Sequence, residues 1–119
     1  MIKHFIFNTD SLAILQLHDD PALARKRFSS LELIQELGLS LDLDEYHLVY
    51  SEPLNEYDDV HEFLENVYCR FNTAIPETYI GHSLSVSDIV VIQKNGVLYG
   101  YYVQPVGFTE LPNFHDLLK

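Results

Sequence analysis

Serine, histidine and aspartate side chains lie close together in the string GHSLSVSD, between Gly81 and Asp88. His82, Ser83, Ser85 and Asp88 include every residue type of a nucleophilic triad. Adjacent side chains of an extended strand point to opposite faces, so His82 and Ser83 diverge, and no glycine follows the serines to form a strained elbow. The string therefore favours side chains that hydrogen-bond the backbone where a strand begins. These four residues are also the candidates if this loop holds a polar binding site.

Motifs for metal, nucleotide or thiol chemistry are missing from the sequence. His61-Glu62 begins like a zinc-binding helix, but no second histidine follows at the required interval. The five glycines are dispersed, so they form no phosphate-binding loop. Cys69 is the single cysteine, which excludes an internal disulfide, and we expect it to be buried as a small apolar residue. We therefore expect no catalytic residue, no metal and no cofactor, and we interpret the chain as a protein that is not an enzyme.

The formal net charge of −11 is concentrated in one part of the chain. The segment between Arg27 and Arg70 holds 11 acidic residues and no lysine or arginine. Such a segment repels nucleic acid, because phosphate binding depends on basic side chains that replace counterions. The segment is either a solvated acidic surface or a surface for a basic partner, for example a mimic of DNA phosphates. The candidate contacts in this segment are Asp58, Asp59, Glu62 and Glu65.

Eight tyrosines are the feature that most favours binding. Each buried tyrosine hydroxyl needs a hydrogen-bond partner, so burial of all eight is unfavourable. Some tyrosines are therefore expected at the surface, where tyrosine is an efficient contact residue. The candidate aromatic contacts are Tyr99, Tyr101, Phe108 and Phe114.

The length of 119 residues, 47% of them hydrophobic, is sufficient for one domain spanning residues 1–119 with a core of its own. The beginning of the chain lacks the apolar core of a signal peptide. No apolar run approaches the ~18 residues of a membrane span. We therefore expect a cytoplasmic protein.

Local patterns predict an α+β fold. Asn95-Gly96 between two apolar runs is the strongest short-range hairpin signal, because a type I′ turn needs positive φ at both central positions. Alternation predicts a strand over Tyr46–Tyr50, and we expect Leu12–Leu17 to form a hairpin or a bent strand with Met1–Phe7. The expected architecture is an antiparallel sheet with a C-terminal β-hairpin over Ile89–Val103, covered by two main helices.

The two helices are marked by capping residues and by apolar periodicity. Ser30–Leu37 begins with serine and ends before Gly38, which are typical helix boundaries. Asp59–Phe71 begins with acidic residues, which favour the positive end of the helix dipole. Its apolar residues recur at helical spacing, so Phe63, Leu64, Val67 and Phe71 should be buried while Glu62 and Glu65 are exposed.

Several short strings occur in a characteristic order along the second half of the chain. They are Gly81-His82-Ser83, Ser87-Asp88, Tyr101-Tyr102-Val103, Gly107-Phe108 and Pro112-x-Phe114. Upstream strings such as Tyr46-His47-Leu48-Val49-Tyr50 and Arg70-Phe71-Asn72 continue the same order. In this order the chain resembles the YodL-like domain family, a small bacterial domain, over roughly Ile14–Phe114. The resemblance carries no catalytic motif onto numbered positions.

We interpret the chain as a non-catalytic protein-binding protein, and the resemblance implies an accessory role in a bacterial mobile or conjugative element. Its partner would be a host, phage or plasmid protein, such as a basic nucleic-acid-binding protein that the acidic surface blocks in an anti-defence role. Two alternatives remain open: a small ligand-binding module or enzyme that uses the Gly81–Asp88 loop, and a regulator of a host cytoskeletal protein through a tyrosine-rich face. Direct binding of nucleic acid or of a membrane is not expected.

Overall fold

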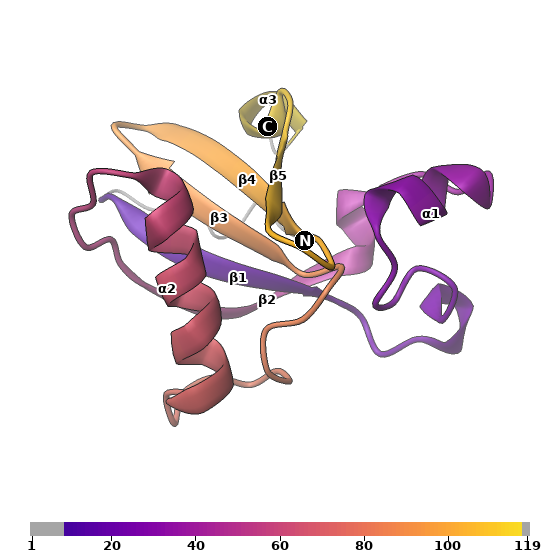
Figure 1. The fold of residues 1–119 in the computed structure, drawn as a ribbon, viewed down its shortest axis with the longest axis horizontal. Coiled ribbons are helices and arrows are strands. Elements are labelled where there is room, and N and C mark those ends of the chain that lie inside the picture. Colours follow the sequence, from indigo (N-terminus) through magenta and orange to yellow (C-terminus); the bar gives the residue numbers. More distant parts are fainter. Residues whose placement is uncertain (1–8, 118–119) are drawn as a thin grey trace.

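One antiparallel sheet organises the part of the chain that the computed structural model describes, residues 9–117 (Figure 1). Its strands lie in the order β2-β1-β3-β4-β5. Their bounds are β1 Ser11–Leu17, β2 Tyr46–Pro53, β3 Ile89–Lys94, β4 Val97–Val103 and β5 Phe108–Leu111. The α-helices are α1 Leu31–Glu36, α2 Val60–Thr73 and α3 Phe114–Leu117, and the 3-10 helices are η2 Pro21–Leu23 and η3 Leu43–Glu45. The predicted α+β class is confirmed, while the predicted strand over Met1–Phe7 lies outside the described residues.

Asn95 and Gly96 form the turn of the β3–β4 hairpin, as predicted. Both residues have positive φ, 53° at Asn95 and 79° at Gly96, which a β-branched residue adopts only under strain. The turn sets the register of the hairpin and places Ile92 opposite Tyr99. The hairpin does not end the sheet, however, because the short strand β5 pairs with β4 beyond it. No sequence pattern predicted β5.

Side chains alternate between the two faces of the sheet, and both faces are buried along β1 and β3. One face packs against α2 through Leu64, Val67 and Phe71. The other face packs against Ile34 of α1 and Phe114 of α3. In Figure 1, α2 crosses in front of the strands, and α1 lies beyond one end of them. None of the helices in residues 9–117 has the length and apolar character to cross a membrane.

Helix α2 begins where the sequence predicts. Asp59 is its N-cap, and the carboxylate accepts a hydrogen bond of 2.9 Å from the backbone N–H of His61. Its apolar stripe is buried with one exception, since Phe63 is only partly buried and stacks on Tyr57 with ring centres 4.7 Å apart. The stripe therefore directs α2 onto the sheet and leaves an aromatic pair at the edge of the core.

Candidate functional site

The acidic residues between Arg27 and Arg70 form two groups on opposite sides of the sheet. One group belongs to α1, η3 and the loop between them, and it comprises Glu32, Glu36, Asp42 and Asp44. The other group belongs to α2 and the loop before it, and it comprises Glu56, Asp58, Asp59, Glu62 and Glu65. All nine of these acids are exposed. The chain therefore presents two acidic surfaces rather than one continuous face.

The remaining two acids of this segment form ion pairs inside the molecule. Glu45 pairs with Lys26. Glu52 accepts two hydrogen bonds from the guanidinium of Arg70, at 2.6 and 2.7 Å, and a third of 2.8 Å from the hydroxyl of Tyr50. Burial opposes the ionised form of Glu52, but these hydrogen bonds outweigh it and lower the pKa of Glu52. Both carboxylates therefore hold the fold together and are not available to a partner.

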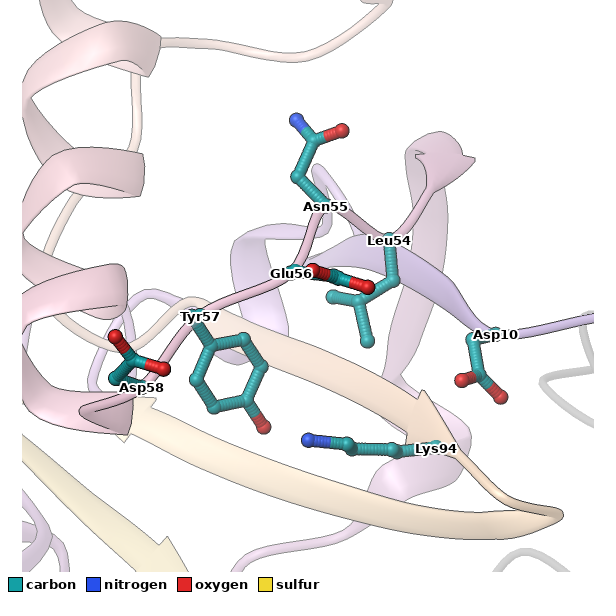
Figure 2. Close-up of a pocket in the computed structure, with 7 residues that line it drawn as sticks. All are labelled: Asp10, Leu54, Asn55, Glu56, Tyr57, Asp58 and Lys94. Carbon is teal, nitrogen blue, oxygen red and sulfur yellow. The ribbon is translucent and has the colours of Figure 1, made fainter.

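The loop before α2 meets the β3–β4 hairpin around a cavity of about 290 Å³. Figure 2 shows its seven lining residues, with Asp58 and Asp10 on either side of Tyr57 and Lys94. The Lys94 ammonium lies 4.6 Å from the centre of the Tyr57 ring, a cation–π arrangement. Tyr57 and Tyr99 also contribute, after burial and Glu110, to raising the pKa of Tyr101 to about 12. The aromatic hairpin and the acidic start of α2 are therefore neighbours.

We call Tyr57, Tyr99 and the exposed acids Asp58, Asp59, Glu62 and Glu65 the acidic–aromatic surface. The four acids and Tyr99, predicted as contacts, are exposed, with 37% exposure at Tyr99. Tyr101 and Phe114 were candidate contacts with core packing as the alternative, and the alternative holds: they are 6% and 2% exposed because they pack into the two cores. Phe108 is partly buried. Tyr57 was missed as a contact because nothing in its sequence neighbourhood shows that it lies beside the hairpin.

A second cluster of polar side chains lies at the far end of β1, around Gln16. The Gln16 side chain is 1% exposed. Its amide nitrogen lies 3.0 Å from the Asp88 carboxylate, 2.8 Å from the His82 carbonyl and 3.1 Å from the Tyr79 hydroxyl. Its amide oxygen accepts a hydrogen bond of 3.2 Å from the backbone N–H of His82. Gln16 therefore fastens the Gly81–Asp88 loop to the sheet.

Asp88 is a structural carboxylate rather than a member of a triad. Its Oδ2 atom accepts a hydrogen bond of 2.8 Å from the backbone N–H of Ser85. The imidazole Nε2 of His82 is 4.0 Å from Asp88 Oδ1, and the Ser85 hydroxyl donates to the Ser83 carbonyl at 2.9 Å. Within residues 9–117, neither Ser83 nor Ser85 hydrogen-bonds the His82 ring through its hydroxyl. The prediction that this string bonds the backbone is therefore confirmed.

Burial raises the pKa of Asp88 to about 8, although the hydrogen bonds from Ser85 and Gln16 act in the opposite direction. A carboxyl group with this pKa is mainly protonated near neutral pH. Tyr79, which lies beside it, has its pKa raised by its own burial and then by Asp88. The cluster thus contains a buried group whose charge changes within the ordinary pH range.

Gly81 allows the loop to approach Gln16 closely. A Cβ atom at Gly81 would lie 2.0 Å from Gln16 Oε1 and 3.0 Å from Val49 Cγ1. Real Cβ atoms do not approach so closely, so Gln16 would have to move. The glycine of the Gly-His-Ser string is therefore explained by its close packing against Gln16.

Next to this cluster the surface opens into a cleft of about 380 Å³, which we call the β1–β2 cleft. It is lined by Gln16, Leu17, Asp19, Arg27, His47, Ile80, Gly81 and His82. His47 lies opposite Gln16 in the β1–β2 pairing. Of the residues proposed for a polar site, only His82 lines this cleft, and Arg27 and His47 were missed because they come from distant segments. Among residues 9–117 there is no group of three or more His, Cys, Asp or Glu side chains that could hold a metal.

The fold and both sites define a small α+β domain with an antiparallel sheet, helices on both faces and polar surfaces at either end of β1. The model of the YodL-like domain matches residues 11–114, and the chain belongs to this family. Comparison with curated proteins found no match, and comparison with solved structures found none either.

Proposed function

We propose that this chain is a non-catalytic binding domain that holds a basic segment of another protein against the acidic–aromatic surface. The observation that carries the proposal is the cavity at which Tyr57 and the exposed Asp58, just before α2, meet Lys94 of the hairpin. Tyr99 is exposed on the same hairpin, and Asp59, Glu62 and Glu65 are exposed along the start of α2. Tyrosine supplies contact area, and unpaired carboxylates supply attraction to cations. Such a surface suits lysine-rich or arginine-rich partners.

The contacts of Lys94 support a basic partner. Asp58, Glu62 and Glu65 form no ion pair with any described residue, so their charges remain available. Lys94 places its ammonium over the Tyr57 ring, which is how a cation binds an aromatic face. A lysine or arginine of a partner would find the same kind of contact at Tyr99, which is exposed on the same face of the hairpin.

The biological setting of the proposal is an accessory role in a bacterial mobile element. A host nuclease or restriction factor binds nucleic acid through basic side chains, so its binding surface has the charge that this domain would recognise. The division of the acids between two sides of the sheet restricts DNA mimicry to the α2 group. A cytoskeletal partner that binds chiefly through Tyr99 is the second candidate, favoured by the exposure of that ring.

A pull-down from bacterial lysate at low and high salt tests the proposal. One variant converts Asp58, Asp59, Glu62 and Glu65 to amides. The matched control converts Glu32, Glu36, Asp42 and Asp44, which removes the same charge from the other side of the sheet. We expect a basic protein to be retained by the wild type and the control at low salt, lost from the first variant, and released by high salt.

Two results would contradict this assignment. If both variants lose the same amount of bound protein, binding depends only on the net charge of the domain. Binding that resists salt and survives the α2 amides, but is lost with Tyr99→Ala, would assign the interface to the hairpin rings alone.

A further inference from the structure

The β1–β2 cleft lies in the part of the molecule where basic residues gather. Three of the five lysine and arginine residues in positions 9–117 are consecutive, from Arg25 to Arg27. Lys26 pairs with Glu45. Arg27, which lines the cleft, donates through Nη2 to the carbonyls of His18 at 2.8 Å and Asp20 at 3.5 Å. It forms no ion pair with a carboxylate of the described residues, so its charge is not neutralised.

Histidines complete the polar wall of the cleft. His47 and His82 line it, and His18 Nδ1 lies 3.2 Å from His47 Nδ1. Burial first, then His18 and His82, lower the pKa of His47. The neutral ring is favoured because burial penalises the charge and because a protonated His47 would face other imidazoles, while no carboxylate of residues 9–117 is bonded to it. A bound anion would supply the missing negative charge.

Apolar side chains stand exposed beside this polar wall. Ile80 lines the cleft and is 77% exposed. Phe28 is 58% exposed, and its ring centre lies 5.8 Å from that of His82. Large apolar side chains that remain in water at the rim of a polar cleft offer contact area to the apolar part of a ligand.

Two strained backbone positions hold the segment that carries Arg27. Phe28 has φ of 64° and Ser87 has φ of 83°. The Phe28 N–H donates to the Ser87 hydroxyl at 3.0 Å, so the two positions are directly joined. Positive φ at residues other than glycine is uncommon and unfavourable, and it is concentrated at functional sites. The fold therefore maintains an unfavourable local conformation at the segment that presents Arg27 and Phe28.

From this geometry we propose that the β1–β2 cleft binds a small molecule that carries an anionic group next to an apolar group. Arg27 and the imidazoles of His47 and His82 hold the anion, and Ile80 and Phe28 contact the apolar part. A volume of about 380 Å³ suits a small ligand. Asp19 lines the same cleft and opposes the anion, so its neutralisation should strengthen binding. This site lies at the opposite end of β1 from the acidic–aromatic surface and does not depend on the function proposed for that surface.

Titration calorimetry with phenyl phosphate, benzoate and inorganic phosphate tests the proposal on the full chain. We expect phenyl phosphate or benzoate to bind more tightly than inorganic phosphate, because only the first two have an apolar group. Tighter binding of phenyl phosphate identifies a phosphate ligand, and tighter binding of benzoate identifies a carboxylate ligand. Arg27→Gln should weaken binding about tenfold or more, since it removes a charge-assisted hydrogen bond.

The matched control is Arg25→Gln, which removes the same charge from an exposed neighbour that does not line the cleft. It should leave the affinity within about twofold of wild type, while Asp19→Asn should increase it about two- to threefold. Equal weakening by Arg25→Gln and Arg27→Gln would overturn the site, as would no binding of any probe. Equal affinity for inorganic and phenyl phosphate would overturn the proposed contact of Ile80 and Phe28 with an apolar group of the ligand.

A measurement on the wild-type protein keeps the test valid if Arg27→Gln fails to fold. The imidazole C–H signals of His47 and His82 should move on addition of the organic anion. The NMR titration of His47 should shift to higher pH, because the bound anion adds negative charge to a ring that faces Arg27, Asp19, His18 and His82. Unchanged imidazole signals at a saturating concentration of probe would contradict the proposal.

Discussion

The two ends of β1 use polar residues in different ways. Near Gln16 the polar groups are buried and bonded to one another, and Asp88 is 1% exposed. Near Asp10, at the other end, the acids of the acidic–aromatic surface are exposed, and only Asp59 is needed by the fold as a cap. A polar cluster that is conspicuous in the sequence thus serves stability, while the side chains of a plain acidic stretch stay exposed to solvent. Substitutions in the buried cluster should therefore lower stability, while substitutions of the exposed acids should not, with the cap Asp59 as the exception.

The largest effect of a substitution at a fixed pH is expected at Gln16. Gln16→Met keeps the side-chain size but leaves the Asp88 carboxyl without its amide donor and the His82 N–H without an acceptor. Buried polar groups without partners are strongly unfavourable, so the free energy of unfolding should fall by about 2–4 kcal/mol. Gln35→Met on the exposed face of α1 is the control and should change it by less than ~0.5 kcal/mol. Equal urea midpoints for the two variants would show that the Gln16 bonds contribute little.

The hairpin turn gives a smaller effect at the other end of the sheet. Gly96→Val places a β-branched residue at φ of 79° and should lower the free energy of unfolding by about 1–2 kcal/mol. Asn95→Gly, at φ of 53°, suits the same turn and should be close to neutral. Thermal unfolding measures both, and an unchanged melting temperature in Gly96→Val would mean that the turn is not needed.

Asp88 should make stability depend on pH. Its pKa is raised to about 8, so between about pH 4 and 8 the folded protein retains a proton that the unfolded chain has lost. The free energy of unfolding therefore falls as pH rises through this window, by up to ~1.4 kcal/mol per pH unit. Asp88→Asn should remove this slope, while the control Asp58→Asn keeps it. If the free energy of unfolding in urea depends on pH in the same way for wild type and Asp88→Asn, the pKa of Asp88 is not raised.

The smallest effects distinguish two adjacent aspartates of the acidic–aromatic surface. Asp59 caps α2 through the N–H of His61, so Asp59→Ala should lower the free energy of unfolding by about 1 kcal/mol. Asp58 accepts no such bond from the residues that the structure describes, and Asp58→Ala should change the free energy of unfolding by less than ~0.5 kcal/mol. Chemical denaturation of both variants makes the comparison. A loss at Asp58 as large as at Asp59 would mean that the exposed acids are structural.

Local signals predicted most of the fold. Asn95-Gly96 set the hairpin and its register, and the capping residues with apolar spacing located α1 and α2. Each of these signals depends only on residues that are close together in the sequence. Strand β5 was missed because Phe108–Leu111 is short and is defined by its pairing with β4 rather than by a pattern of its own.

The sites were predicted less completely, because they are assembled from distant segments. The β1–β2 cleft combines Arg27, His47 and His82 from three parts of the chain. Tyr101 was a candidate surface contact and is buried, because it packs into the same core as α2. Cys69 shows the reverse: burial was predicted, and the residue is exposed on α2. The sequence did contain one signal for the buried polar cluster. Gln16 is a polar residue within the otherwise apolar run Leu12–Leu17.

The central position of β1 has a consequence for how the chain reaches its fold. β1 lies between β2 and β3, and its Leu15 pairs with Ile89. During synthesis this apolar strand leaves the ribosome long before β3 is made, so one of its edges stays without its final partner. Pairing over such a sequence distance is slow, and an unpaired apolar strand is prone to aggregate. We therefore expect folding to be completed only after the β3–β4 hairpin has emerged, with β1 as the segment most in need of protection until then.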